Sequence, residues 1–132
     1  MKYNEFYICN KEGKSNCVVR SLCKTFNEKY ENVYNDLCNI AEELKCESFN
    51  DIEVFETYMK RRDILPIECG KDLKIKDLDL DDGKYLVFCW DKKDYYHMVS
   101  IIDNVLYDKN SKSLDLYVIT LYKENVKVKK QQ

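Results

Sequence analysis

The hydrophobic residues of this chain change their spacing near its middle, and this change restricts the possible folds more than any other feature. Over residues 17–26 and about 31–44 they recur every three or four positions, which predicts two amphipathic helices. A third helix is expected to start near Ser48, where Ser48-x-x-Asp51 resembles a capping box, and to end before Pro66. The first half is therefore predicted to be helical.

The second half follows β patterns. Residues 85–90 and 95–102 are apolar and aromatic runs, and 105–108 returns after a tight turn at Asp103-Asn104. Residues 114–122 supply a fourth run. Helices followed by strands predict an α+β domain, with the N-terminal helices on one side of a C-terminal antiparallel sheet.

Length and charge limit the organisation and the partners. The 132 residues suggest one domain over 1–132, with a core at about 10–122 and a frayed tail at 127–132. The 22 basic and 24 acidic side chains nearly cancel, which argues against binding to nucleic acid or to anionic lipid. No apolar run is long enough for a membrane span, and the N-terminus lacks a signal-peptide core. We therefore expect a cytoplasmic protein.

Seven cysteines are many for such a chain, and none forms a Cys-x-x-Cys pair. A structural zinc site is therefore not expected, and in the cytoplasm the thiols should be reduced. Most of them should act as small buried hydrophobic residues. The sequence predicts no metal and no cofactor.

Cys17 differs from the other cysteines because it lies where a polar loop, residues 11–16, meets the first helical pattern. A helix N-terminus stabilises a thiolate through free N–H groups and the helix dipole. Cys17 is therefore a candidate nucleophile, and the alternative is an ordinary buried helix residue.

His97 is the only histidine, and it lies within the apolar run 95–102 on the strand face that carries Tyr95, Val99 and Ile101. A catalytic thiol requires a base, and no other imidazole exists in the chain. The alternative is a structural histidine held by hydrogen bonds.

The hairpin register predicts partners for this imidazole. A two-residue turn at Asp103-Asn104 pairs Ile102 with Val105, and continuing the register places Asn110 opposite His97. Asp108 is then the diagonal neighbour on the same face. Either side chain can orient an imidazole, whereas both also suit a plain turn at the end of a strand.

Acyl transfer also requires donors for an oxyanion. The backbone N–H of Cys17 is one candidate, and the side chain of Asn10 or Asn16 is a second. The alternative for Asn16 is an N-cap of the helix.

A cysteine at the start of the first long helix, then a histidine on a strand and Asp or Asn on the next, resembles the papain-like cysteine peptidases. Residues 16–22, 30–37, 97–103 and Tyr107-Asp108 look like small bacterial and phage members, akin to bacteriocin-leader peptidases and cell-wall amidases. The resemblance spans about residues 10–122.

This resemblance implies a papain-like fold with Cys17 as nucleophile, His97 as general base and Asp108 as its orienting partner. The family places a glutamine a few residues before the cysteine, and this chain has none there. The implied function is a thiol-dependent hydrolase or acyltransferase acting on an amide bond of a peptide or protein, in a bacterium or the host of a phage. The alternative is an inactive papain-like module, encoded by a phage or mobile element, that binds a host protein; eleven tyrosines would suit an interface.

Overall fold

The computed structural model describes residues 1–7 and 16–124, which form three helices, six strands and two short 3-10 helices. The helices are α1 (Cys17–Phe26), α2 (Tyr30–Leu44) and α3 (Ile52–Arg61), with η1 (Ile75–Asp77) and η2 (Ser111–Asp115). The strands are β1 (Lys2–Glu5), β2 (Ile64–Ile67), β3 (Lys84–Trp90), β4 (Tyr96–Ile102), β5 (Val105–Asp108) and β6 (Tyr117–Glu124). The predicted α+β class, with helices before the main strands, is confirmed.

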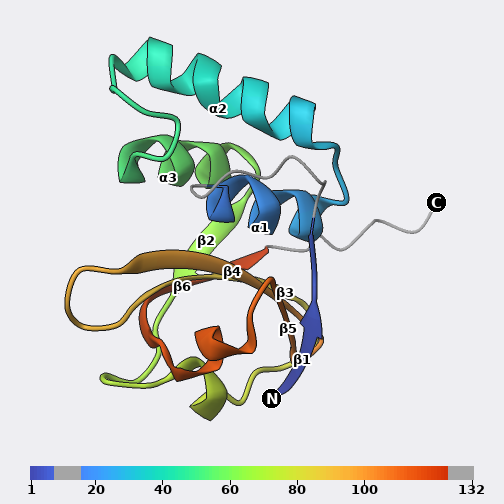
Figure 1. Ribbon diagram of the computed structural model, residues 1–132. Helices are drawn as coiled ribbons and strands as arrows, with labels where there is room; N and C mark the ends of the chain where they lie inside the picture. Colours follow the sequence, from blue (N-terminus) through green and yellow to red (C-terminus); the bar gives the residue numbers. More distant parts are fainter. Residues whose placement is uncertain (8–15, 125–132) are drawn as a thin grey trace.

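The six strands form one curved sheet in the order β1-β5-β4-β3-β6-β2, and the three helices lie together on one side of it (Figure 1). The strands of the second half pair antiparallel, as predicted, but the whole sheet is mixed, because the N-terminal strand β1, which was not predicted, pairs with β5 in parallel. β1 has the sequence KYNE, which carries no alternating apolar pattern, so contacts with a distant segment place it. The Tyr3 hydroxyl and the Phe6 N–H both donate to the backbone carbonyl of Asp108, each at 2.9 Å.

Two other elements depart from the expected boundaries. α3 starts at Ile52 instead of near Ser48, because the Ser48 hydroxyl accepts a hydrogen bond from the backbone N–H of Asn50 in a turn. β2 contains Pro66, which is tolerated because this strand lies at the edge of the sheet.

The β4–β5 hairpin has the expected register, with Ile102 paired to Val105. Asp103 and Asn104 form its two-residue turn with φ angles of 50° and 62°. Two successive positive φ angles define a turn whose twist matches that of the strands. The local sequence of the turn therefore sets the register of the hairpin, and with it where His97 and Asp108 lie relative to each other on the two strands.

Two apolar clusters lie on opposite faces of the sheet, and β3 contributes to both by alternation. Leu86 belongs to the cluster beneath the helices, whereas Val87 belongs to the cluster on the other face. The first cluster holds the helices on the sheet through residues such as Leu22 and Phe55. These two cores leave the N-terminus of α1 beside the start of β4.

A polar stripe on α1 fixes this helix over β4. Cys17, Ser21 and Thr25 are four residues apart and therefore share one face. The Ser21 hydroxyl donates to the carbonyl of Met98 at 2.8 Å, and the Thr25 hydroxyl lies 3.1 Å from that of Ser100. The stripe thereby directs Cys17 towards the start of β4, where His97 lies.

Residues 1–7 and 16–124 contain no helix with both the length and the apolar character needed to cross a membrane. Within the same ranges, no three His, Cys, Asp or Glu side chains are grouped so as to hold a metal ion. The six described cysteines are free thiols.

Candidate active site

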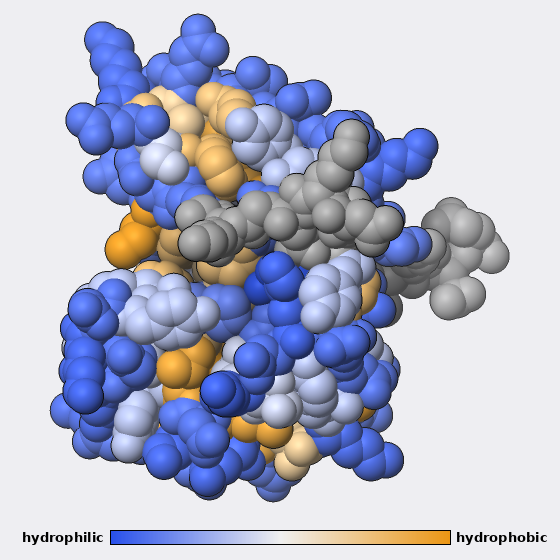
Figure 2. All heavy atoms as spheres, viewed as in Figure 1, coloured by the Kyte–Doolittle hydropathy of each residue, from blue (hydrophilic) through white to orange (hydrophobic). Residues whose placement is uncertain are grey.

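A cleft of about 1110 Å³ separates the helices from one end of the sheet. Cys17, His97 and Asp108 line it together with Phe55, Tyr95 and Lys109. Figure 2 shows this face of the molecule, with the helices above, the strands below, and apolar side chains exposed along the boundary between them. Cys17 and His97, the predicted catalytic pair, therefore line the same cleft.

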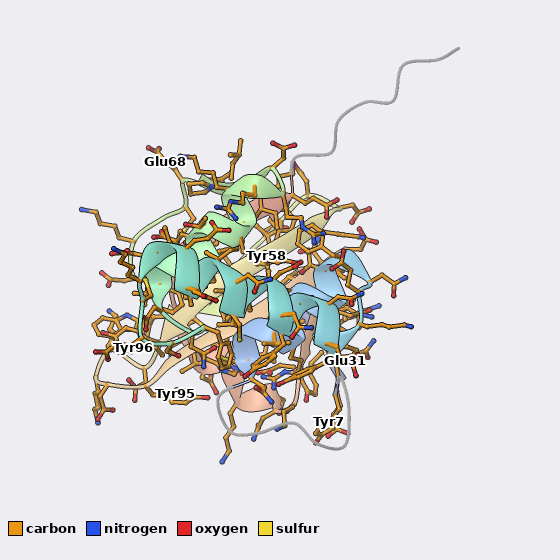
Figure 3. The ribbon with its side chains drawn as sticks, turned by 90° about the horizontal axis from the view of Figure 1, so that it is seen from above. Tyr7, Glu31, Tyr58, Glu68, Tyr95 and Tyr96 are labelled. Atoms are coloured by element: carbon orange, nitrogen blue, oxygen red, sulfur yellow. The ribbon has the colours of Figure 1, made fainter. Side chains whose placement is uncertain are left out.

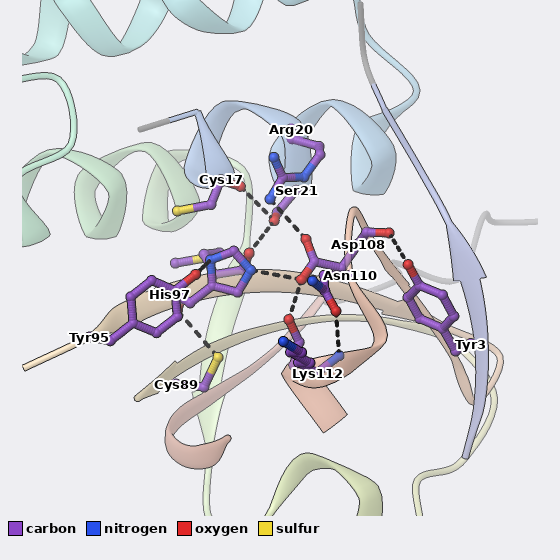
Figure 4. Close-up of polar contacts among 12 residues, drawn as sticks. Tyr3, Cys17, Arg20, Ser21, Cys89, Tyr95, His97, Asp108, Asn110 and Lys112 are labelled. Atoms are coloured by element: carbon purple, nitrogen blue, oxygen red, sulfur yellow. Dashed lines mark hydrogen bonds and ion pairs between the residues drawn. The ribbon is translucent and has the colours of Figure 1, made fainter. Parts of the chain in front are cut away.

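Asp108, at the end of β5, is the centre of the polar network below this cleft (Figure 4). One carboxylate oxygen lies 2.7 Å from Nε2 of His97 and also accepts a hydrogen bond from the Ser113 hydroxyl. The other oxygen accepts a hydrogen bond from Nη2 of Arg20 at 2.8 Å. Burial alone would raise the pKa of Asp108, but His97, Ser113 and Arg20 lower it below its usual value. Asp108 is therefore held as a buried carboxylate.

His97 lies between this carboxylate and the thiol of Cys17. Burial favours the neutral imidazole, but hydrogen bonds and charge interactions with Asp108 and Cys17 outweigh it and raise the pKa of His97 to about 9. Nε2 is bound to Asp108, so Nδ1 is the nitrogen that remains for proton exchange with the thiol. At neutral pH the ring is therefore an imidazolium oriented by Asp108.

Cys17 is half-buried at the first residue of α1. Burial would raise the pKa of its thiol, but His97, the backbone of Met98 and the charge of Arg20 together lower it. Because the Cys17 pKa falls while the His97 pKa rises, the two groups favour a thiolate–imidazolium pair. Such a pair is the reactive form of a nucleophilic cysteine.

Cys46 also lines the cleft, but its surroundings act in the opposite direction. Burial, Glu53 and Asp51 all raise the pKa of its thiol, and its Sγ lies 3.9 Å from a carboxylate oxygen of Glu53. At neutral pH Cys46 is therefore a protonated thiol, which makes it an internal reference for Cys17.

The structure distinguishes between the two predicted partners of His97. The β4–β5 ladder ends at the pair Ser100–Tyr107, and the chain turns into η2 before Asn110 comes opposite His97. The Asn110 side chain instead accepts a hydrogen bond from the backbone N–H of Lys112 at 2.9 Å. Asp108, the diagonal neighbour, therefore contacts the imidazole, and Asn110 caps η2.

The predicted oxyanion donors are less well placed. Asn16 occupies the N-cap position of α1, as expected, but its side chain makes no capping hydrogen bond. Its Oδ1 accepts from the Tyr30 hydroxyl at 3.1 Å, and Asn16 is absent from the described lining of the cleft. Asn10 lies outside the described residues. The backbone N–H of Cys17, at the start of α1, remains the candidate donor.

Sequence reasoning missed Arg20, Ser113 and Tyr95. Arg20 could have been found, because it follows Cys17 by one helical turn and interrupts a buried apolar stretch. Tyr95 precedes His97 by two residues, and its hydroxyl lies 3.3 Å from Nδ1. No local signal indicates Ser113, because its contact with Asp108 depends on how the chain turns through η2.

No family model, curated protein or solved structure matches this chain. Arguments about its function therefore rest on the chemistry of the Cys17–His97–Asp108 arrangement and of the cleft around it.

Proposed function

We propose that this protein is a thiol-dependent hydrolase or acyltransferase that acts on an amide or peptide bond, in the manner of papain-like cysteine peptidases. One observation carries the proposal: a thiol with a lowered pKa and a carboxylate-bound imidazole with a raised pKa share one open cleft. Perturbed pKa values of opposite sign in neighbouring groups are typical of acid–base and nucleophile pairs.

In the proposed reaction the Cys17 thiolate attacks the substrate carbonyl carbon and forms a C–S bond. The backbone N–H at the start of α1 donates to the resulting oxyanion. His97 then transfers its Nδ1 proton to the leaving nitrogen as the C–N bond breaks. Water or an amine attacks the thioester, returns a proton to Nδ1, and releases the acyl group as the C–S bond breaks. Asp108 keeps the imidazole oriented throughout.

The cleft supports a peptide or protein as the substrate. Its volume of about 1110 Å³ exceeds the range of about 300–1,000 Å³ that is usual for small-molecule sites. Its lining combines aromatic side chains such as Phe55 with charged ones such as Lys109 and Glu53. A polypeptide segment presents both kinds of surface.

The proposal can be tested by alkylation of the native protein with iodoacetamide at a series of pH values, read by mass spectrometry at each cysteine. Cys17 should label rapidly below pH 7, whereas Cys46 should label only as its thiol deprotonates at higher pH. The His97→Ala variant should lose the rapid labelling of Cys17 and leave that of Cys46 unchanged. If Cys17 and Cys46 label with the same pH dependence in the native protein, the enzyme proposal is wrong and a binding module is favoured.

A further inference from the structure

Tyr95 contacts the same imidazole nitrogen that serves Cys17. Nε2 of His97 is bound to Asp108 at 2.7 Å, and the Tyr95 hydroxyl lies 3.3 Å from Nδ1. The two rings stack with centroids 5.6 Å apart and an interplanar angle of 24°. Tyr95 is half-exposed and lines the cleft in which a substrate would bind.

The backbone around Tyr95 is held by Asp91. The carboxylate of Asp91 accepts hydrogen bonds from the backbone N–H groups of Lys93, Asp94 and Tyr95, at 2.8, 3.1 and 3.1 Å. The N–H of Asp91 in turn donates to the carbonyl of Tyr95 at 3.2 Å. The position of the phenol over His97 is therefore built into the β3–β4 loop.

The proposed reaction defines which part of the substrate comes near Tyr95. The oxyanion is drawn towards the N-terminus of α1, whereas the leaving nitrogen must approach the proton on Nδ1 to within about 3 Å. The Tyr95 oxygen lies 3.3 Å from that same Nδ1 atom. The leaving group and the phenol therefore share the space in front of one ring nitrogen.

We propose that Tyr95 is a catalytic residue on the leaving-group side, where its phenol holds the leaving nitrogen or oxygen beside Nδ1 of His97. The inference rests on the proposed thiol acyl-transfer function. The phenol oxygen accepts a hydrogen bond from the N–H of the leaving amine, or its O–H donates to a leaving oxygen. The C–S bond has already formed when the bond to the leaving group breaks. The proton that completes the leaving group comes from Nδ1, and the phenol keeps its own proton.

Tyr96 provides a matched control because it is the next residue and is equally exposed. Figure 3 shows Tyr95 and Tyr96 next to each other at one edge of the molecule. The ring of Tyr96 stacks on Phe88 and Trp90, with centroids 5.8 and 5.5 Å apart. Among the described residues, the tyrosine hydroxyl that contacts the His97 ring is that of Tyr95 and not that of Tyr96. Both Tyr→Phe substitutions keep the stacked rings and remove one hydroxyl.

The test compares two acetyl donors by the single-turnover rate of Cys17 acetylation, measured by mass spectrometry. The leaving group of p-nitrophenyl acetate departs as a stable anion, whereas the alkoxide of trifluoroethyl acetate needs a proton as it leaves. Tyr95→Phe should slow the trifluoroethyl reaction about tenfold more than the p-nitrophenyl reaction, since aid to proton transfer supplies part of a general-acid effect. Tyr96→Phe should show no such difference between the two donors.

Three results would contradict this inference in distinguishable ways. Equal slowing of both reactions in Tyr95→Phe would mean that the phenol only positions His97, and no slowing would mean that it has no role. If p-nitrophenyl acetate acetylates Cys17 of the native protein no faster than Cys46, the proposed function itself fails, and the inference fails with it.

Discussion

Cys17 and Cys46 line the same cleft, yet their surroundings have opposite effects on their thiols. Cys17 is the first residue of α1, where free N–H groups and the helix dipole favour a negative charge. Cys46 follows the C-terminus of α2, the negative end of the helix dipole, which disfavours a negative charge, and it faces Glu53. The imidazolium of His97 further lowers the pKa of Cys17, and the carboxylates of Asp51 and Glu53 further raise the pKa of Cys46.

The comparison separates exposure from reactivity. Both residues are partly exposed, and the more enclosed Cys17 thiol is the one whose pKa is lowered. Helix polarity and neighbouring charge decide which one becomes a thiolate. Altering these surroundings should therefore make the two cysteines alike or separate them further.

The largest effect is expected from removing the Cys17 thiol itself. Cys17→Ala should lower the rate of p-nitrophenol release from p-nitrophenyl acetate by at least about 10³-fold, since no other thiol within residues 1–7 and 16–124 interacts with the imidazole of His97. Its free energy of unfolding should change by less than about 1 kcal/mol, because the side chain is half-buried. Cys69→Ala, which removes an exposed thiol, is the control and should retain the rate. Full activity in Cys17→Ala would exclude the nucleophile assignment.

Asp108→Ala should be the most destabilising of the substitutions considered. It removes the carboxylate that accepts a hydrogen bond from the Arg20 guanidinium, 4% exposed, in the protein interior. Breaking a buried pair from one side costs about 3–5 kcal/mol. The control is Glu43→Ala, which removes the partner of the half-exposed Arg61 and should cost no more than about 1 kcal/mol. Urea denaturation of both variants measures the difference, and equal costs would contradict the buried character of the Asp108 network.

The raised pKa of His97 predicts how stability depends on pH. Its stabilising contribution is complete below the unfolded pKa of about 6.5 and is lost as the pH rises through the folded value of about 9. The Cys17 thiol titrates with the opposite sign, so the comparison is made in Cys17→Ala. In this variant the His97 pKa is raised less, because Cys17 no longer contributes and Asp108 alone opposes burial. In that background the free energy of unfolding should fall by about 1–2 kcal/mol between pH 6 and pH 9.5.

The control for this measurement is the double variant Cys17→Ala, His97→Ala, which should lose most of that pH dependence. Urea denaturation at the two pH values supplies both numbers. An identical fall in the single and double variants would assign the pH dependence to groups other than His97.

Removing His97 should make the reactivity of the Cys17 thiol more like that of the Cys46 thiol. Burial raises the pKa of Cys17, and without the imidazolium fewer groups lower it. The rate at which iodoacetamide labels Cys17 at pH 6 should therefore fall about tenfold or more. The labelling rate of Cys46 is the reference within the same sample. A Cys17 that labels as fast in His97→Ala as in the native protein would show that groups other than His97 activate it.

The smallest effect is expected from changing the carboxylate beside Cys46. Glu53→Gln removes one negative charge near the sulfur of Cys46 and should lower the pKa of Cys46. The effect should be slight, because solvent screens the exposed Glu53 carboxylate. Labelling of Cys46 at pH 8 should rise about twofold, while that of Cys17 should not change. A fall in Cys46 labelling would contradict the cause assigned to its raised pKa.

Local patterns in the sequence predicted much of the fold and indicated Cys17 and His97 as the candidate catalytic pair. The spacing of apolar residues predicted three helices and the main strands, because each helix or strand hides one face from water. The Asp103-Asn104 turn determined the hairpin register, and with it the position of Asp108 relative to His97. Cys17 was evident from its place at a helix start, and His97 from being the only imidazole.

Contacts between distant segments decided the rest. The parallel pairing of β1 and the approach of Arg20 to the Asp108 carboxylate join residues that no local pattern relates. The turn into η2, which keeps Asn110 from His97 and brings Ser113 to Asp108, also has no local signal. The same holds for the pKa values, because burial and charge at each group depend on which side chains packing brings near it. The sequence by itself therefore determined where a thiol and an imidazole lie along the chain. Only the tertiary structure decided that they share one cleft with a buried carboxylate, because only packing brings these distant segments together.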